Sequence, residues 1–76
     1  MSPSPKSLGM RLKTIRERKQ LSQATVATRA GIAREHLARL EAGAYSPSVD
    51  TLEKIATALG VSLLTVLAPP RRRRRG

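Results

Sequence analysis

The sequence predicts an all-α protein built from five short helices. Apolar residues recur at spacings of three and four along most of the chain, which is the period of an amphipathic helix. Ser, Gly and Pro separate these runs at the places where helices begin and end. No segment alternates apolar and polar residues as a half-buried strand does, and the chain has one Tyr and neither Phe nor Trp.

The first helix is expected at roughly residues 7–19. Leu8, Leu12 and Ile15 lie on one side of it at positions i, i+4 and i+7, and charged residues occupy the rest of its surface. Ser7 is a suitable N-cap for this helix. The Ser- and Pro-rich residues 1–7 are expected to form a disordered arm. This places the folded domain at residues 8–67 and a disordered Pro- and Arg-rich tail at residues 68–76.

Four shorter helices are expected after the first. A Ser side chain before a helix accepts a free backbone N–H of the first turn, and Gly tolerates the left-handed conformation that often follows the last turn. The expected helices are residues 23–30, between Ser22 and Gly31; residues 33–41, before Gly43; residues 49–59, between Ser48 and Gly60; and a last helix that begins after Ser62 and stops at Pro69 and Pro70.

Positive charge is the strongest signal in the composition. Fifteen Lys and Arg residues face five Asp and Glu residues, for a net charge of +10. Five of the arginines form the run of residues 71–75, and without that run the net charge is still +5 because ten basic residues face the five acidic ones. Nucleic acid is the commonest partner of so basic a small domain, and an anionic lipid surface or an acidic protein comes next.

The composition argues against an enzyme and against a metal site. There is no Cys and only one His, so no metal or other cofactor is expected. The sequence has no nucleophile with a matched base, no acid–base pair and no phosphate-binding Gly loop. No apolar run approaches the roughly 18 residues of a membrane span, and the N-terminal residues lack the apolar core of a signal peptide. A cytoplasmic, soluble protein is therefore expected.

Two of the expected helices fit a helix-turn-helix pair. In this motif a short turn joins two helices that cross at about 90–120°. Ala27 is small enough for close approach at the crossing, and Gly31 suits the sharp turn. On the second helix Glu35 and Arg39 point away from its apolar side, so this helix has a polar outward face. The residues expected to face inward are Val26, Ala30, Ile32, Ala33, Leu37 and Leu40.

The stretches LSQATVATRAGIAREHLARLEAG and PSVDTLEKIATALGVS, together with the order of five helices, resemble the Cro/repressor-type (XRE) helix-turn-helix family. The resemblance covers about residues 8–67 and implies a five-helix lambda-repressor-like DNA-binding domain. Ala33 departs from the family pattern, in which Ser or Thr is usual, and Ala is a poorer N-cap by about 1 kcal/mol.

The resemblance implies contacts to bases from the helix at residues 33–41, which would enter the major groove. Arg is suited to the O6 and N7 atoms of guanine and Glu to the amino group of cytosine, so a G·C-containing half-site is expected. A solvent-exposed ion pair between Glu35 and Arg39, worth about 0.2–0.5 kcal/mol, is the competing interpretation. The residues implied to contact bases are Arg34, Glu35, His36 and Arg39.

The resemblance also implies contacts to phosphates and one structural ion pair. Tyr45 is expected either to pack over its loop or to touch phosphate, and Arg16 is expected to pair with Glu41. The basic tail is interpreted as a nonspecific DNA contact or as a solubilising segment. The residues implied to contact phosphates are Ser22, Gln23, Ala44, Tyr45, Ser46 and Arg11; the tail residues are Arg71, Arg72, Arg73, Arg74 and Arg75.

The sequence thus predicts a sequence-specific double-stranded DNA-binding regulator of transcription, most simply a repressor that binds as a homodimer formed near its last helix. Three alternatives stay open. An antitoxin with a toxin partner and the controller protein of a restriction–modification system would have the same fold. A nonspecific nucleic-acid-binding adaptor would depend on the arginine run of residues 71–75 instead of on Arg34 and Arg39.

Overall fold

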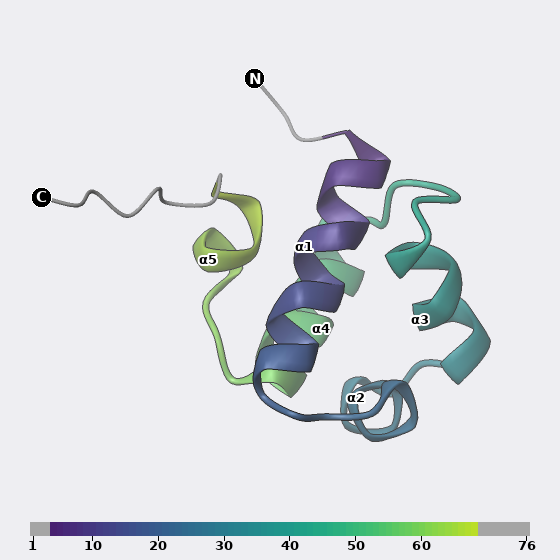
Figure 1. The fold of residues 1–76 in the computed structure, drawn as a ribbon, viewed down its shortest axis with the longest axis vertical. Helices are drawn as coiled ribbons and strands as arrows, with labels where there is room; N and C mark the ends of the chain where they lie inside the picture. Colours follow the sequence, from purple (N-terminus) through teal and green to yellow (C-terminus); the bar gives the residue numbers. More distant parts are fainter. Residues whose placement is uncertain (1–3, 69–76) are drawn as a thin grey trace, which may run out of the picture.

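The computed structural model describes residues 4–68. Residues 1–3 of the expected N-terminal arm and residues 69–76 of the expected tail lie outside this range. The described residues form five α-helices and no strand, as the sequence predicts (Figure 1). The helices are α1 (Pro5–Arg18), α2 (Gln23–Ala30), α3 (Arg34–Glu41), α4 (Val49–Leu59) and α5 (Leu63–Leu67).

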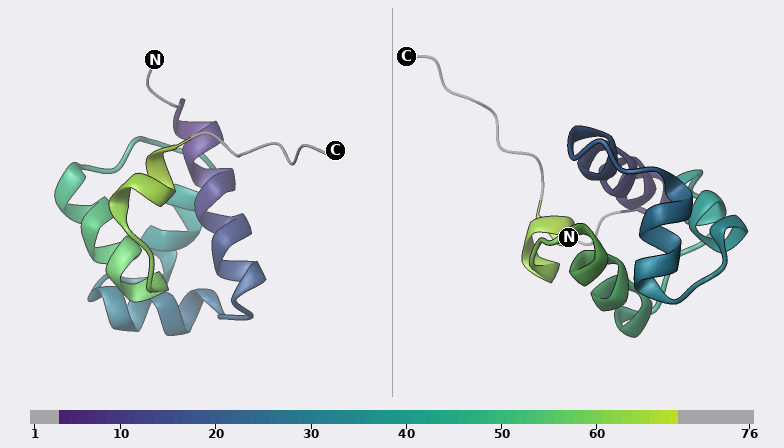
Figure 2. Two further views of the ribbon diagram at one scale, coloured as in Figure 1. Left: turned by 90° about the vertical axis from the view of Figure 1, so that its left-hand side faces the viewer. Right: turned by 90° about the horizontal axis from the view of Figure 1, so that it is seen from below.

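The helices pack in a closed ring around one core. α1 packs against α3 on one side and α5 on the other; α2 packs against α3 and α4; α4 also packs against α5. Figure 1 shows α3 and α5 on opposite sides of α1, with α2 across the lower end. The view from below in Figure 2 (right) shows the same separation of α3 from α5. This arrangement gives α1 two different faces, one toward α3 and one toward α5.

All five helices contribute to the core. Val26, Ile55 and Val66 have no exposed surface. Truncation of a buried Leu or Ile, such as Ile55, to Ala typically lowers the stability of the folded protein by about 2–5 kcal/mol. Ile15, Leu21 and Ile32 are partly buried against the same cluster. The remaining buried apolar residues are Leu8, Leu12, Ala27, Ala30, Leu37, Leu40, Leu52, Ala56, Ala58 and Leu59.

Three helices begin with the same capping pattern, Ser-x-x-Thr. In each, the Ser Oγ accepts the backbone N–H of the Thr three residues later, which satisfies a donor that the helix leaves free. The two hydroxyl groups of each pair are also hydrogen-bonded to one another. The pairs are Ser22–Thr25, Ser48–Thr51 and Ser62–Thr65, with N···Oγ distances of 3.0, 3.1 and 3.2 Å.

The start of α1 differs from the expectation. The N-cap is Ser4 and not Ser7, because the backbone N–H of Ser7 donates to Ser4 Oγ at 3.1 Å. Pro5 occupies the first helical position, where its fixed φ suits the helix and its missing N–H costs nothing. Residues 5–7 are therefore helical, so the boundary expected at residue 7 was wrong.

Gly9 lets α1 approach the end of α3 closely. It is buried, and a Cβ atom at this position would overlap the backbone carbonyl oxygens of Leu40 and Glu41. Gly43, with φ of 78°, ends α3 and lies against Lys6, where a Cβ atom would come within 2.7 Å of Lys6 Cα. Backbone contact at both positions sets the distance between α1 and α3.

We predict that Gly9→Ala destabilises the protein by about 1–3 kcal/mol, the usual cost of overpacking. Urea unfolding followed by circular dichroism measures the change. An exposed helical Gly replaced by Ala would instead gain up to about 1 kcal/mol, so a more stable Gly9→Ala protein would contradict the close approach. Gly60→Ala is the control. Gly60 has φ of 76°, and a Cβ atom there would meet no atom within 4 Å, so this variant measures the cost of backbone strain without any overlap of atoms.

Candidate nucleic-acid interface

α2, a tight turn and α3 form the helix-turn-helix unit. Gly31 adopts a left-handed conformation with φ of 73°, which ends α2 and starts the turn. The backbone N–H groups of Gly31 and Ile32 donate to Thr28 and Ala27 carbonyls at 3.2 and 3.0 Å. Ala27 is buried at the crossing, and Leu37 is buried beyond it, as the sequence predicts.

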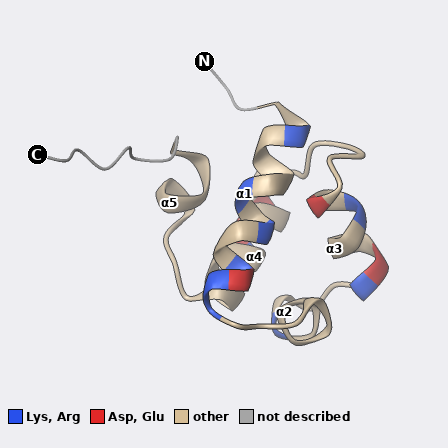
Figure 3. Cartoon of the chain, in the orientation of Figure 1, with Lys and Arg blue, Asp and Glu red and all other residues tan. Residues whose placement is uncertain are grey.

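α3 divides into a buried side and an exposed side. Leu37 and Leu40 are each 1% exposed and anchor the helix in the core. Arg34, Glu35 and Arg39 are exposed, and charged residues extend along the whole of α3 in Figure 3. The structure thus brings the predicted base-contacting arginines and glutamate onto one solvent-facing helix, while its apolar residues hold that helix in place.

The arginines of α3 are not in ion pairs with any residue that the structure describes. Within residues 4–68 the ion pairs are Arg16–Glu41 at 2.7 Å, Lys54–Asp50 at 3.4 Å and Arg16–Glu17 at 4.0 Å. The Glu35–Arg39 pair that the spacing allowed is absent from this part of the chain. The guanidinium groups of Arg34 and Arg39 therefore remain available to a ligand.

His36 and Tyr45 form a stacked pair. Their ring centroids are 5.6 Å apart and their planes differ by 25°. Tyr45 follows α3 in the loop before α4, so the stack ties this loop to the side of α3. The stack leaves 39% of Tyr45 exposed. The neighbouring loop residues Ala44 and Ser46 are exposed.

The predicted pair of Arg16 and Glu41 is formed and belongs to a larger buried network. Arg16 Nε donates to Glu41 Oε2 at 2.7 Å and its Nη2 donates to Oε1 at 2.9 Å, a bidentate arrangement. The remaining Nη1 donates to the Leu21 carbonyl at 2.9 Å. The hydrogen bond to Glu41 raises the pKa of Arg16, although burial opposes this shift.

Gln23 joins this network, which the sequence did not indicate. Its Nε2 donates to Glu41 Oε1 at 2.9 Å, so the amide nitrogen expected at a phosphate lies against a buried carboxylate instead. The two residues are 18 positions apart, and no local pattern relates them. Ser22, also expected at a phosphate, caps α2 and remains exposed.

Arg11 lies apart from the other residues predicted to contact phosphate. Its Nη1 donates to the carbonyls of Val66 and Leu67, at 3.2 and 2.9 Å, at the end of α5. Helix C-termini favour such a cation because their last carbonyls have no partner in the helix. The spacing of the apolar residues of α1 correctly predicted that Arg11 lies on the polar side of this helix. The end of α5 packs beside this polar side and accepts the hydrogen bonds of Arg11. The contact of Arg11 with phosphate stays a prediction.

A capped helix, a left-handed turn and a second helix with an exposed, charged face define the helix-turn-helix class of DNA-binding proteins. The model of the Helix-turn-helix family HTH_3 matches residues 12–66. The chain therefore belongs to this family, whose members found by comparison are regulators of transcription rather than enzymes.

The relatives include both phage and bacterial proteins. The immunity repressor protein of Bacillus phage phi105 is 38% identical over 61 residues, which are 80% of this chain. Those residues span 42% of the phage repressor, so this chain corresponds to less than half of that relative.

Two solved structures have the same fold. The restriction–modification controller protein C.AhdI of Aeromonas hydrophila is 32% identical, with a TM-score of 0.79 over 82% of this chain and 94% of the controller. SinR, a master regulator for biofilm formation solved in complex with DNA, is 35% identical, with a TM-score of 0.73 over 78% of this chain and 95% of that chain. Within residues 4–68, no helix has the length and apolar character needed to cross a membrane.

We predict that Ala33→Ser stabilises the protein by about 0.5–2 kcal/mol. Ala33 precedes α3 with an extended backbone but offers no side-chain acceptor, whereas a Ser hydroxyl there would accept a free N–H of the first turn. Thermal unfolding measures the gain. Ala42→Ser, at the other end of the same helix, is the control and should leave stability nearly unchanged because no free N–H lies there. Equal effects of the two variants would refute the capping argument.

We predict that Glu41→Ala destabilises the protein by about 1.5–3 kcal/mol, the usual contribution of hydrogen bonds to a charged group, because it leaves the partly buried guanidinium of Arg16 without its partner. Glu17→Ala removes the other carboxylate near Arg16, but that side chain is 58% exposed and 4.0 Å away, so its loss should cost less than about 1 kcal/mol. Urea unfolding of both variants gives the comparison. Similar losses would mean that the buried network does not stabilise the fold.

Proposed function

We propose that the protein is a sequence-specific double-stranded DNA-binding repressor of transcription that inserts α3 into the major groove. The observation that supports this best is the division of α3 into a buried apolar side, with Leu37 and Leu40, and an exposed side whose Arg34 and Arg39 have no acidic partner within residues 4–68. The solved structure of the related SinR contains DNA, which supports the same kind of ligand here. Its site of action would be the nucleoid in the cytoplasm.

The side chains of α3 suit bases rather than backbone alone. We infer that Arg34 and Arg39 donate to guanine O6 and N7 and that Glu35 accepts from the amino group of cytosine. Each good bidentate pair discriminates against a wrong base by about 1–3 kcal/mol. His36, half-buried in its stack with Tyr45, lies at the edge of this set and would complete the base contacts.

The segments on either side of α3 suit the phosphate backbone. Ser22 at the start of α2 and the exposed loop residues Ala44, Tyr45 and Ser46 would hold the strands that border the groove. Gln23 donates one amide hydrogen to Glu41, and the second hydrogen on the same nitrogen would be its donor to a phosphate. The net charge of +10, including Arg71 to Arg75, predicts strongly salt-dependent binding.

A homodimer on DNA is the arrangement we propose for specificity. Leu64 on α5 is 75% exposed, an apolar side chain left over after Val66 has filled the core. Pairing of two copies through this end of the domain would set two half-sites about one helical turn apart, near 34 Å.

A second candidate is the controller of a restriction–modification system. It is favoured by the match to C.AhdI, which this chain covers over 94% of its length. A binding motif located next to restriction and methyltransferase genes in the source genome would favour this function, and a motif elsewhere would argue against it.

We predict that selection from a randomised duplex pool, at about 150 mM salt to limit nonspecific attraction, enriches a two-fold symmetric motif. Arg39→Ala should lower affinity for that motif by about 5- to 150-fold, equivalent to 1–3 kcal/mol, and relax the preference at one base pair per half-site.

The control for this prediction is Arg18→Ala, which removes the same charge from an exposed position on α1. It should keep the motif, as should a variant with Gln at residues 71–75. No enriched motif, or a motif lost only with the arginine run, would favour the nonspecific adaptor and refute base contact by α3.

A further inference from the structure

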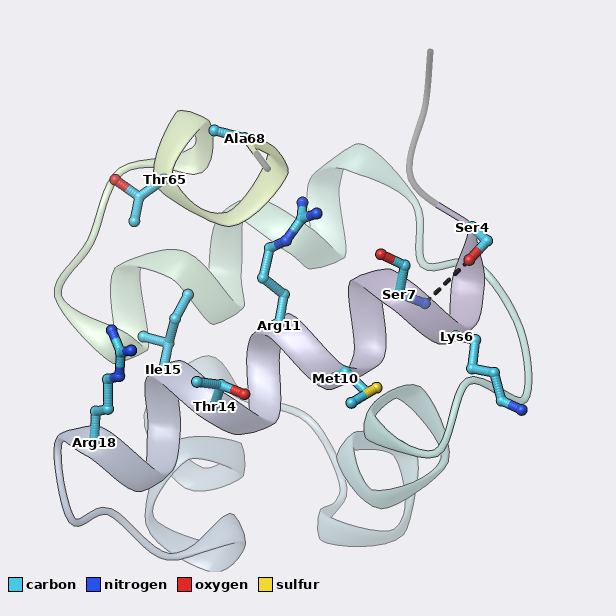
Figure 4. Close-up of a pocket in the computed structure, with 10 residues that line it drawn as sticks. All are labelled: Ser4, Lys6, Ser7, Met10, Arg11, Thr14, Ile15, Arg18, Thr65 and Ala68. Atoms are coloured by element: carbon cyan, nitrogen blue, oxygen red, sulfur yellow. Dashed lines mark hydrogen bonds between the residues drawn. The ribbon is translucent and has the colours of Figure 1, made fainter. Parts of the chain in front are cut away.

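A groove lies between α1 and α5, and no feature of the DNA interface uses it. Its volume is about 760 Å³. Of the α1 residues that line it, Arg11, Thr14 and Arg18 are on the opposite side of the helix from Gly9 and Arg16, which face α3. Lys6, at one end of the groove, lies against Gly43, which follows α3. Figure 4 shows Arg11 and Ile15 pointing from α1 toward α5, where Thr65 and Ala68 form the other side. We call this surface the α1/α5 groove.

The α1/α5 groove combines apolar surface with positive charge. Met10 is 62% exposed and Ile15 is half-buried, and Figure 4 shows them on different sides of α1, so the groove offers two separate apolar contacts. Lys6, Arg11 and Arg18 line it as well, and within the described residues no Asp or Glu does. Arg11 is held in place by its hydrogen bonds to the end of α5. An occupant therefore needs apolar side chains and negative charge together.

We propose that the α1/α5 groove binds an acidic amphipathic helix of a partner protein. The lining extends along α1 from Ser4 to Arg18, about 20 Å, which matches a partner helix of about 14 residues. Apolar residues at i, i+3, i+4 and i+7 of that helix would cover Met10 and Ile15, and flanking carboxylates would face Lys6 and Arg18.

Two other occupants fit less well. A second copy of this chain is proposed above to pair through Leu64, which does not line the groove. Duplex DNA offers negative charge but no apolar side chain to cover the exposed Met10. Arg11, Thr14 and Arg18 are on the side of α1 turned away from α3, so a partner that lies over them leaves the exposed face of α3 free for DNA (Figure 1).

The experiment uses the full chain labelled with ¹⁵N and a fluorescein-labelled synthetic helix of about 14 residues, with Leu at i, i+4, i+7 and i+11 and Glu on both flanks of that stripe. We expect the peptide to shift the amide signals of Met10, Thr14 and Thr65. The same peptide with Lys in place of every Glu should not bind.

Two matched charge reversals locate the contact. Arg18→Glu changes a residue of the groove, whereas Lys13→Glu makes the same change in net charge at an exposed position of α1 outside it. By fluorescence anisotropy, Arg18→Glu should weaken peptide binding by about fivefold more than Lys13→Glu does, the effect of one lost exposed ion pair. Met10→Ser should weaken binding without any change of charge.

Three results would overturn the proposal. Equal weakening by Arg18→Glu and Lys13→Glu would mean general attraction between charges. Amide shifts confined to α3 would place the peptide on the DNA interface. Binding of phosphatidylglycerol vesicles that Met10→Ser weakens, with no binding of the acidic peptide, would mean that the groove recognises a membrane surface and not a protein.

Discussion

The carboxylate of Glu41 is the interaction on which the position of α3 depends. Glu41 ends α3 and is 7% exposed, the only charged residue buried within residues 4–68. A buried charge costs several kcal/mol unless it is paired and hydrogen-bonded. Here Arg16 of α1 and Gln23 of α2 both donate to it. One carboxylate thus joins three helices and fixes the DNA-facing helix against the rest of the domain.

Close backbone contact reinforces this geometry. Gly9 brings α1 against the same end of α3 that Glu41 occupies, so the ion pair and the helix contact lie together. The face of α1 that packs on α3 is unavailable for anything else. Its opposite face, with Thr14 and Arg18, is therefore free to form part of the α1/α5 groove. The separation of the proposed DNA and protein contacts follows from this use of α1 on two sides.

The basic residues are chemically similar in the sequence but differ in the structure. Arg16 is enclosed by a carboxylate and a carbonyl, and Arg11 holds the end of α5. Arg34 and Arg39 lie on exposed helix surface and have no acidic partner within residues 4–68. A net charge alone indicates attraction to an anion. The hydrogen-bond and ion-pair partners of each guanidinium group determine whether that arginine is free to bind an anion.

The sequence by itself determined the helices, because the interactions that begin and end them join residues within about four positions. Ser22 and Gly31 illustrate this, and even the misplaced N-cap of α1 moved only from Ser7 to Ser4. The Arg16–Glu41 pair was also expected, but only through the family resemblance. Tertiary structure alone decided the partner of Gln23, the stack of His36 on Tyr45 and the place of Arg11. These contacts join different helices or loops, so they depend on how the helices pack and not on the local pattern of any one of them.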